Sequence, residues 1–462
     1  MDMLAQALSV EQLKAQVQGA VIVPGDAEYD AARMAWNLSV NQYPDVVVVA
    51  ADVADVAAAV AFAAENDLGI AVQSTGHGIT LPADGALLIV TSHLTDLRVD
   101  PQAQTAWVGA GLKWGAVLAE TQQYGLAPLL GSSPDVGVVG YTLGGGMGWL
   151  ARKHGLATDS VRAFEIVTAA GEVIRASAAE NADLFWALRG GGGSFGVVTG
   201  MEIRLYPVDT VYGGNLFYPG AMAREVFTRY RQWIAAASDD LTSSISVMKF
   251  PPLPDVPEPM RGQAFVIVRG LYAGPVAEGE ALVNAWREWS APLMDDFRAM
   301  PFSEVGTVSN DPVDPMPGLS SGAWLGEITD EVVETLIARI VEGESPVVAA
   351  EIRHAGGAIA RADASASAYS HRAAQHLLQM VAFTPAPEVY AAAQRYMTQV
   401  KEEIQSALTG GVYMNFLEGE EAHARTQQGY APETYRRLMA VKAQYDPRNR
   451  FSFSYNIPPQ AQ

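Results

Sequence analysis

The first 206 residues alternate short β-branched runs with an amphipathic helix and several turns. Residues 45–50 form a β-branched run that predicts a buried strand. Asp52 can cap an alanine-rich helix that Gly69 ends, and residues 70–73 start another strand. This β-α-β unit leads the chain into a loop of small residues at 74–80.

The rest of this first part shows the same mixture. The patterns predict strands at 105–109 and 197–205, helices at 112–122 and 181–188, and a hairpin of 164–168 with 172–176. Residues 131–148 are dense in glycine and predict a loop region. Residues 1–206 therefore predict an α+β unit with several glycine-rich turns.

The character of the chain changes after residue 206. Residues 207–410 have fewer glycine clusters and alternate strand-like runs with amphipathic helices. The predicted strands are 264–268 and 347–353, and the predicted helices are 281–289, 331–340 and 387–408. We expect a second domain at 207–410, and a C-terminal segment at 411–462 with signals of its own at 413–416 and 446–459.

Charge and composition exclude several classes of function. The 51 acidic against 30 basic residues give a net charge of -21, so there is no basic footprint for nucleic acid or for an anionic membrane surface. The chain has no cysteine, which excludes disulfides, thiol nucleophiles and Cys-ligated zinc. The start of the chain has no basic stretch before a long apolar one, so we expect no signal peptide and a cytoplasmic protein. The seven histidines show no metal-binding spacing, and no metal site is expected.

One motif matches known patterns in letters only. Residues 191–196 read G-G-G-S-F-G, which fits both the dinucleotide fingerprint and the nucleophile elbow around Ser194. Both motifs need a strand before them and a helix after them. Here the predicted helix precedes and the predicted strand follows, so we reject an NAD site and a hydrolase nucleophile.

Two other glycine-bearing loops suggest a large ligand. His77 lies between Gly76 and Gly78 directly after a strand, and such a loop exposes successive N–H groups that suit a pyrophosphate. Three glycines at 144–146 let the backbone approach a flat or charged ligand closely. A turn histidine and tight turn packing are the alternatives for each loop alone. Together with residues 190–196, the loops favour a large ligand with several polar segments.

These segments together resemble the berberine bridge enzyme-like flavoproteins of the vanillyl-alcohol oxidase type. The likeness runs from about residue 40 to the C-terminus. It is carried by G-H-G around His77, by residues 132–159, by L-F-W-A-L-R-G-G-G-G-S-F-G, and by the tail Y-D-P-R-N-R-F-S-F-S-Y-N-I-P-P. The resemblance implies an α+β fold with a two-part FAD-binding domain of the PCMH type. The inserted substrate domain would be built on an antiparallel sheet flanked by helices.

The resemblance also implies a covalent cofactor. The family's histidine bonds to the 8α-methyl of FAD, and here that residue is His77; the bond raises the flavin potential. Ser133 stands where some members carry a second, cysteinyl link, so a single bond is expected and an oligosaccharide substrate is disfavoured. Gln73 and Thr75 depart from the family's usual Arg and Gly. The full set of implied FAD contacts is Gln73, Ser74, Thr75, Gly76, His77, Gly78, Ser133, Val136, Gly137, Gly140, Tyr141, Thr142, Gly145, Val197 and Asn456.

Four of these positions carry more specific expectations. Val136 matches the family's oxygen-gating position, and Tyr141 stands where many members have a histidine near the flavin. Val197 matches a backbone contact to the adenine part, and Asn456 a polar contact near the isoalloxazine. Ordinary core or loop packing is the alternative for each of the four residues.

The resemblance does not identify a catalytic base in this chain. Phe416 and Met147 occupy the two positions where members carry a tyrosine, and neither side chain can accept a proton. We take Tyr141, Glu351 and His354 as replacement candidates. On the predicted strand, Glu351 points to one face and His354 to the other. Solvated or ion-paired strand residues are the alternative.

The expected function is that of an FAD-dependent oxidase. It would take a hydride from a C–H beside an alcohol oxygen or an amine nitrogen of a small molecule and reduce dioxygen to hydrogen peroxide. Two alternatives stay open. The first is a dehydrogenase with another electron acceptor, which Val136 disfavours. The second is a flavin-bearing protein that binds a small molecule without turnover, which Phe416 and Met147 favour. The sequence does not indicate an oligomeric state.

Overall fold

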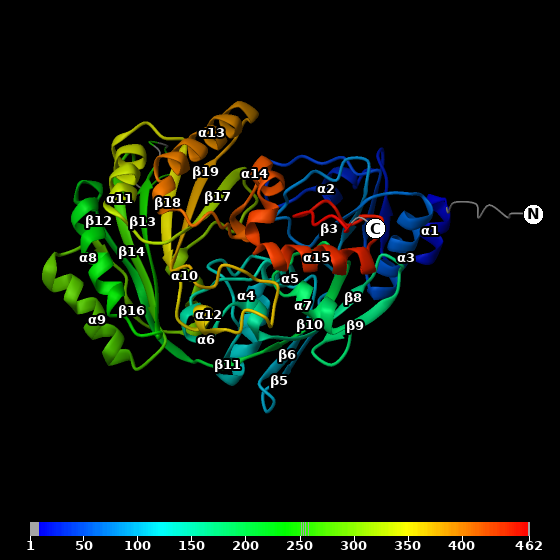
Figure 1. The fold of residues 1–462 in the computed structure, drawn as a ribbon, viewed down its shortest axis with the longest axis horizontal. Helices are drawn as coiled ribbons and strands as arrows, with labels where there is room; N and C mark the ends of the chain where they lie inside the picture. Colours follow the sequence, from blue (N-terminus) through cyan, green and yellow to red (C-terminus); the bar gives the residue numbers. More distant parts are fainter. Residues whose placement is uncertain (1–8, 251, 253, 255, 257, 461–462) are drawn as a thin grey trace, which may run out of the picture.

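The structure is a computed structural model that describes residues 9–250, 252, 254, 256 and 258–460. Residues 1–8, where the expected absence of a signal peptide would be tested, lie outside that range. The strands from β12 to β19 lie on one side of the molecule, and helices α1 and α3 lie on the other (Figure 1). Among the described residues, none of the helices combines the length and apolar character needed to cross a bilayer.

The first sheet is mixed and has the order β1-β2-β4-β3. Its strands are β1 (Ala20–Ile22), β2 (Val46–Val49), β3 (Ile70–Gln73) and β4 (Leu87–Val90), with β2, β4 and β3 parallel. Helix α3 (Val53–Glu65) connects β2 to β3, which confirms the predicted β-α-β unit. The Asp52 side chain caps α3 as predicted by accepting the N–H of Asp55. Asp55 itself is buried and accepts backbone N–H groups of Gln18, Gly19 and Ala51, which ties the chain before β1 to this helix.

The second sheet is antiparallel, in the order β5-β6-β10-β8-β9. Its strands are β5 (Leu97–Asp100), β6 (Thr105–Gly109), β8 (Val161–Val167), β9 (Val173–Ser177) and β10 (Val197–Arg204). The predicted hairpin is confirmed as β8 and β9. Helix α7 (Ala182–Leu188) precedes the 191–196 loop and β10 follows it, so the rejected motifs lack their context. Ser194 is fully buried and donates its hydroxyl to the Tyr455 carbonyl at 2.9 Å, which is a structural role.

One prediction for the glycine-rich region is wrong. Residues 131–148 were expected to be a loop, but helix α5 (Val138–Leu143) forms inside them. Val138, Val139 and Leu143 are buried against the core, and Thr142 donates its hydroxyl to the Val138 carbonyl at 2.7 Å. β-branched residues have low intrinsic helix propensity, so here burial decides what the local pattern hides.

The third sheet is antiparallel throughout and supports the inserted part of the chain. Its order is β15-β12-β14-β13-β18-β19-β17, and β16 also pairs with β12. The strands are β12 (Thr210–Pro219), β13 (Leu241–Lys249), β14 (Ala264–Tyr272), β15 (Met294–Asp295), β16 (Arg298–Pro301), β17 (Gly318–Leu325), β18 (Val347–His354) and β19 (His376–Phe383). All of them fall within residues 207–410, and the expected antiparallel sheet flanked by helices is confirmed.

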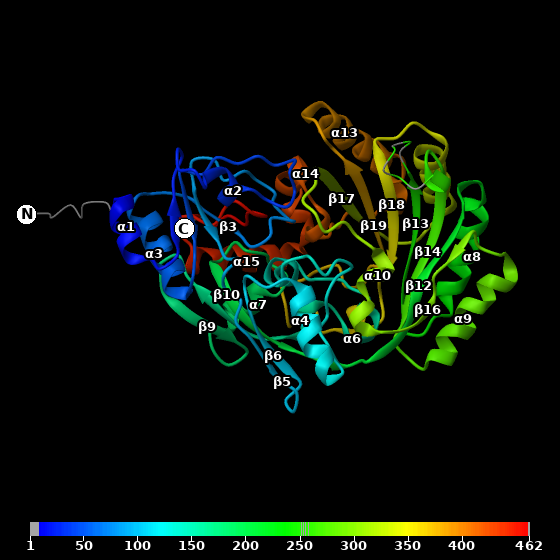
Figure 2. The same ribbon diagram turned by 180° about the vertical axis from the view of Figure 1, so that it is seen from behind.

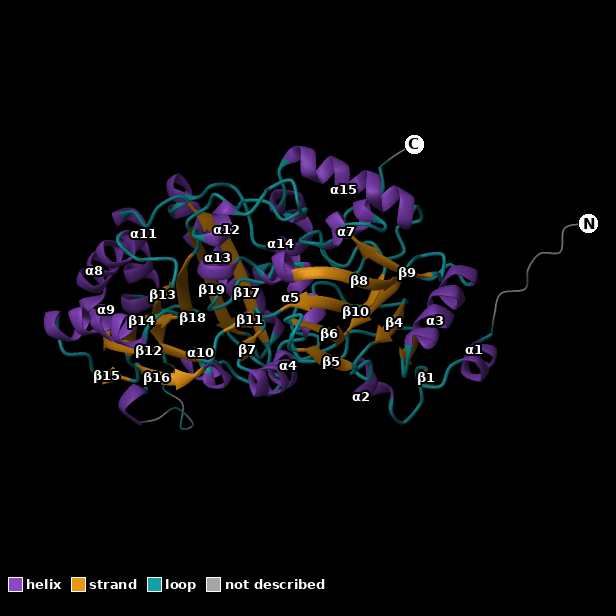
Figure 3. Ribbon diagram, turned by 90° about the horizontal axis from the view of Figure 1, so that it is seen from below, coloured by secondary structure: helices purple, strands orange, loops and turns teal. Residues whose placement is uncertain are grey.

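The longer helices of this part of the chain cover one face of the third sheet. They are α8 (Ala223–Ala235), α9 (Val276–Trp289), α11 (Asp330–Leu336) and α13 (Pro387–Glu403), and their apolar side chains form one core with the strands. The views in Figures 1 and 3 place these helices on the outer side of the sheet. The opposite face is therefore turned toward the first two sheets.

After α13 the chain returns to the first two sheets (Figure 2). The returning helices are α14 (Gly419–Ala424) and α15 (Pro432–Tyr445). The other α-helices and strands, which lie elsewhere in the chain, are α1 (Val10–Gln16), α2 (Tyr29–Arg33), α4 (Trp114–Thr121), α6 (Ala151–His154), α10 (Gly306–Ser309), α12 (Ala358–Arg361), and the paired β7 (Leu126–Ala127) and β11 (Tyr206–Pro207). Lys442 on α15 is fully buried, 2.6 Å from Asp446, and also donates to the Ser194 carbonyl at 2.6 Å. This buried pair fastens the returning segment to the 191–196 loop.

Replacing Lys442 with methionine leaves Asp446 charged and unpaired in the core. Breaking a buried ion pair in this way costs about 3–5 kcal/mol, so K442M lowers the free energy of unfolding by about that amount in urea titrations. The control is K14M, which removes an exposed pair with Glu11 and changes stability by less than about 0.5 kcal/mol. A K442M protein as stable as the K14M protein would contradict the fastening role.

Candidate functional site

In the loop after β3, the backbone of Gly76 lies close to the backbone of Ala35 and Trp36. Gly76 has a φ of +80°, and a Cβ there would lie 2.6 Å from the Cβ of Ala35, so only glycine fits. A Cβ on Gly137 would lie 3.4 Å from the Ser74 hydroxyl oxygen, so the two predicted cofactor loops are in contact. The Ser74 hydroxyl is buried and has no hydrogen-bond partner among the described residues. Such a group fits a polar ligand.

His77 is held by two other side chains. Its ring stacks on Trp36, with centroids 4.1 Å apart and an interplanar angle of 19°. Its Nε2 lies 3.4 Å from Oδ2 of Asp135, whose Oδ1 lies 2.6 Å from Nζ of Lys113. Burial lowers the pKa of His77 below its usual value, while Asp135 opposes the shift, so the imidazole is neutral at neutral pH.

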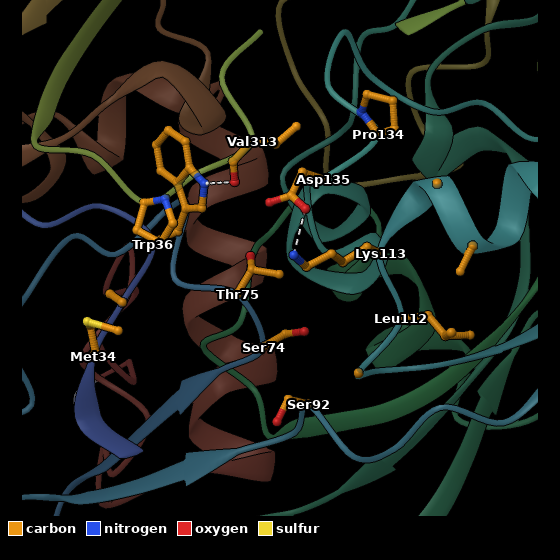
Figure 4. Close-up of a pocket in the computed structure, with 15 residues that line it drawn as sticks. Met34, Trp36, Ser74, Thr75, Ser92, Leu112, Lys113, Pro134, Asp135 and Val313 are labelled. Atoms are coloured by element: carbon orange, nitrogen blue, oxygen red, sulfur yellow. Dashed lines mark hydrogen bonds and ion pairs between the residues drawn. The ribbon is translucent and has the colours of Figure 1, made fainter. Parts of the chain in front are cut away.

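A cavity of about 660 Å³ opens beside this loop (Figure 4). Its lining combines Trp36, Lys113 and Asp135 with Ser74 and Thr75, the two predicted cofactor residues that it touches. The rest of the wall is mostly apolar: Met34, Ala35, Ser92, Gly111, Leu112, Gly115, Ala116, Pro134, Val313 and Pro315. The cavity therefore covers only one edge of the predicted cofactor site.

The glycine run of residues 144–148 is where three parts of the chain meet. A Cβ on Gly145 would lie 2.5 Å from the ring of Tyr369, and one on Gly146 would lie 2.5 Å from the ring of Tyr141. The Tyr413 hydroxyl oxygen accepts the N–H of Gly146 at 3.1 Å and of Met147 at 3.0 Å. Side chains at Gly145 and Gly146 would collide with these rings.

Three of the predicted cofactor residues use their side chains within the protein. Gln73 donates to the Met34 carbonyl at 2.9 Å, and Thr142 donates to the Val138 carbonyl. The Ser133 hydroxyl oxygen accepts the Asp135 N–H at 3.3 Å. Any contact that Gln73 or Thr142 makes with a ligand therefore comes from the backbone.

Other predicted cofactor residues have unpaired polar atoms or open space beside their backbone. The Asn456 side-chain oxygen and the Tyr141 hydroxyl are buried without a hydrogen-bond partner among the described residues. Val197 is the buried first residue of β10, and Gly78 and Gly140 have open space where a Cβ would be. Unpaired buried polar atoms are rare in native proteins. Together with Ser74 they fit a large ligand with separate polar segments, which is the chemistry of FAD.

The inner face of the third sheet carries a buried ionic cluster. Nε of Arg353 donates to Glu351 at 2.9 Å, Nη1 of Arg269 lies 3.5 Å from it, and Ser244 donates to it at 2.6 Å. Burial raises the pKa of the Glu351 carboxyl, but the two arginines and Ser244 outweigh that effect and bring the pKa to about 2. The guanidinium of Arg353 lies 4.9 Å from the ring centre of Phe416. The Glu351 face of β18 is thus turned toward the returning C-terminal segment.

The other two base candidates do not fit that role. His354 lies on the opposite face of β18, as the alternation predicts, and its Nε2 is 3.0 Å from Nη1 of Arg152. Burial and Arg152 lower the pKa of His354 to about 3, so its lone pair is held by the guanidinium. Burial raises the pKa of Tyr141 well above its usual value. Neither residue takes up a substrate proton readily at neutral pH.

Glu418 is a partly buried acid that the sequence did not indicate. Its Oε2 accepts the Ser320 N–H at 2.8 Å and the side-chain amide of Asn37 at 3.3 Å. Burial raises the pKa of Glu418 to about 8, in spite of these two bonds. The residue joins the N-terminal part, β17 and the returning segment, and no local pattern reports a contact between positions 381 residues apart.

Comparison with known families gives two matches within this chain. Residues 44–177 match the FAD binding domain model, and residues 412–458 match the model described as berberine and berberine like. In the sequence, the two matched segments flank the residues that form the third sheet. Together they contain all of the predicted cofactor residues except Val197.

Similar proteins match over nearly the whole length. An uncharacterized FAD-linked oxidoreductase of Bacillus subtilis, YgaK, is 30% identical over 96% of this chain and 98% of its own. The (R)-6-hydroxynicotine oxidase of Paenarthrobacter nicotinovorans is 28% identical over 96% of this chain and 97% of its own. The crystal structure of 6-hydroxy-D-nicotine oxidase from Arthrobacter nicotinovorans superposes with a TM-score of 0.84 at 26% identity, over 96% of this chain and 98% of the other.

The raised pKa of Glu418 predicts a specific pH dependence of stability. A carboxyl whose pKa rises from its usual 4.5 to about 8 on folding contributes stability below pH 4.5 that is lost as the pH rises toward 8. Glutamine at this position keeps both accepted bonds and cannot ionise. The melting temperature of E418Q therefore equals that of the unmodified protein near pH 4.5 and exceeds it by about 2–4 °C at pH 8.5.

The matched control is E420Q, which changes an exposed glutamate two residues further on. Its melting temperature follows that of the unmodified protein at every pH. An E418Q difference that stays constant between pH 4.5 and 8.5 would show that folding does not raise the pKa of Glu418.

Proposed function

Because the chain belongs to the berberine bridge enzyme-like FAD-linked oxidoreductases, we propose that it is an oxidase with one covalent histidyl-FAD at His77. Its substrate is a small molecule with an oxidisable C–H beside an alcohol oxygen or an amine nitrogen. When bound, FAD supplies a hydride acceptor whose electrons pass to dioxygen and give hydrogen peroxide. The observation that carries the proposal is the neutral, immobilised imidazole of His77 in a loop that also presents the unpaired Ser74 hydroxyl.

Different residues of the chain hold different parts of this cofactor. The loop at 74–78 offers backbone N–H groups and the Ser74 hydroxyl to the pyrophosphate. Asn456 and Tyr141 offer buried, unpaired polar atoms further along the site. Ser133 replaces the cysteine of a second link, so His77 alone forms a covalent bond.

Glu351 is the residue proposed to orient the substrate. With a pKa of about 2 its carboxylate stays ionised, so it accepts a hydrogen bond from a hydroxyl or amine but does not retain a proton at neutral pH. Arg353 and Arg269 fix the carboxylate in place before the substrate arrives. This arrangement suits an amine that binds neutral, because its oxidation needs no strong base.

One observation favours a second candidate function, a flavin-bearing protein that binds a small molecule without turnover. The phenyl ring of Phe416 lies under Arg353, and Met147 is buried, so neither family tyrosine position can take up a proton. Anaerobic mixing with a panel of amines and alcohols separates the two functions. Bleaching of the flavin supports the oxidase, and ligand binding without bleaching supports the binding protein.

The covalent link predicts where the colour goes on denaturation. Acid precipitation of the purified protein leaves all the yellow colour in the pellet, because the bond at His77 survives unfolding. The H77A pellet is colourless, and the H93A pellet, in which an exposed histidine is replaced as the matched control, is yellow. Colour in the supernatant of the unmodified protein would overturn the covalent link, and a colourless protein would overturn the proposed function itself.

The orienting role predicts a loss of turnover in E351Q. Glutamine keeps the volume but removes the charge that accepts the substrate's hydrogen bond, so kcat/KM falls about 10²-fold in a peroxide assay, with the flavin spectrum unchanged. The control is E334Q, which removes a carboxylate exposed on the outer helix α11. Turnover by E351Q within twofold of the control would exclude Glu351 from the substrate site.

A further inference from the structure

Within the part of the chain that the structure describes, Asp135 is the one carboxylate that contacts the His77 ring. Its two oxygens have different partners: Oδ2 faces Nε2 of His77 at 3.4 Å, and Oδ1 faces Nζ of Lys113 at 2.6 Å. The side chains of His77 and Asp135 are 16% and 14% exposed, so water screens their contact only partly. The backbone of Asp135 is held as well, because its N–H donates to the Ser133 hydroxyl.

This contact decides which nitrogen of His77 carries the proton. A carboxylate accepts hydrogen bonds and cannot donate, so the neutral imidazole beside it carries its N–H on Nε2. The lone pair is then on Nδ1, for which no hydrogen bond is found within the described ranges. The stacked Trp36 ring, whose own N–H donates to the Val313 carbonyl at 3.0 Å, fixes the plane of the imidazole.

We propose that Asp135 is the positioning residue for covalent attachment of the flavin: it fixes the tautomer of His77 with the lone pair on Nδ1 and accepts the Nε2 proton as the bond forms. The inference rests on the histidyl-FAD proposed above and adds the group that orients the imidazole and receives its proton. The resemblance gave Asp135 no role.

Covalent attachment at His77 is a two-electron oxidation. Nδ1 of His77 forms a bond to the carbon of the 8-methyl group, and one C–H bond of that methyl and the N–H bond of the imidazole break. Two protons and two electrons leave in total; Asp135 takes the imidazole proton first and passes it to solvent. Dioxygen, the oxidant that the proposed oxidase already uses, takes up the two electrons and two protons as one molecule of hydrogen peroxide.

The environment of Asp135 suits a transient proton acceptor. Nζ of Lys113 lies 2.6 Å from Oδ1, so the carboxylate has an adjacent cation on the side away from His77. The side chain of Lys113 is about half exposed, so the proton has a route to water on that side. The cavity of about 660 Å³ next to Asp135 and Lys113 opens the same region (Figure 4).

The test measures covalent incorporation, not turnover. The full-length protein is expressed in riboflavin-starved cells and incubated with FAD and air, and acid-insoluble flavin is followed with time. D135N binds FAD, as seen by quenching of flavin fluorescence, but incorporates it about 10²-fold more slowly. D135E recovers much of the rate, and D240N, which removes a carboxylate paired with Lys153 elsewhere, incorporates FAD normally.

A second readout separates a positioning role from a merely structural one. Nuclear magnetic resonance of the flavin peptide from the unmodified protein identifies the bonded nitrogen, and the proposal expects Nδ1. Attachment through Nε2, or incorporation by D135N at the normal rate, would overturn the role of Asp135 and leave the histidyl-FAD intact. Absence of covalent flavin from the unmodified protein as well would overturn the covalent link and this inference together.

Discussion

The architecture depends on a stretch of backbone that has no side chains on its crowded side. At Gly145 and Gly146 the rings of Tyr369 and Tyr141 occupy the space that a Cβ would need. The backbone N–H groups of Gly146 and Met147 are thereby left within reach of the Tyr413 hydroxyl oxygen, which accepts both. Tyr369 and Tyr413 come from far along the chain, so the glycine run joins the cofactor loop to the segments around these two tyrosines.

Burial and neighbouring charges set the protonation states of Glu351 on the third sheet and of His77 in the cofactor loop. On the inner face of the third sheet, two arginines keep Glu351 ionised in a place where burial alone would protonate it. At the cofactor loop the balance is reversed, because burial prevails over Asp135 and keeps His77 neutral. One site thus presents a fixed acceptor for a substrate, and the other a neutral nucleophile for a cofactor. Both properties come from neighbours on other elements of the fold.

Local signals in the sequence predicted part of the elements and the candidate loops, but not strands β12, β13, β17 and β19 or helix α8. Asp52 caps its helix as expected, and the alternation along β18 places Glu351 and His354 on opposite faces. Helix α5 was missed because burial overrides the low helix propensity of its β-branched residues. The partners of His77 were missed for another reason: its contact with Asp135 spans 58 residues, and no pattern of spacing reports such a contact. Tertiary contacts likewise set the environment of His354, whose Nε2 lies 3.0 Å from Nη1 of Arg152, 202 residues away.

The central claim is that His77, in the loop where the first sheet meets the glycine-rich segments, carries the flavin alone. Peptide mass spectrometry of the protease-digested holoprotein tests it most directly. The account predicts that every flavin-bearing peptide contains His77, with the added mass of one flavin, and that peptides containing Ser133 are unmodified. A flavin on another residue, or an unmodified His77 peptide from a yellow protein, would contradict it.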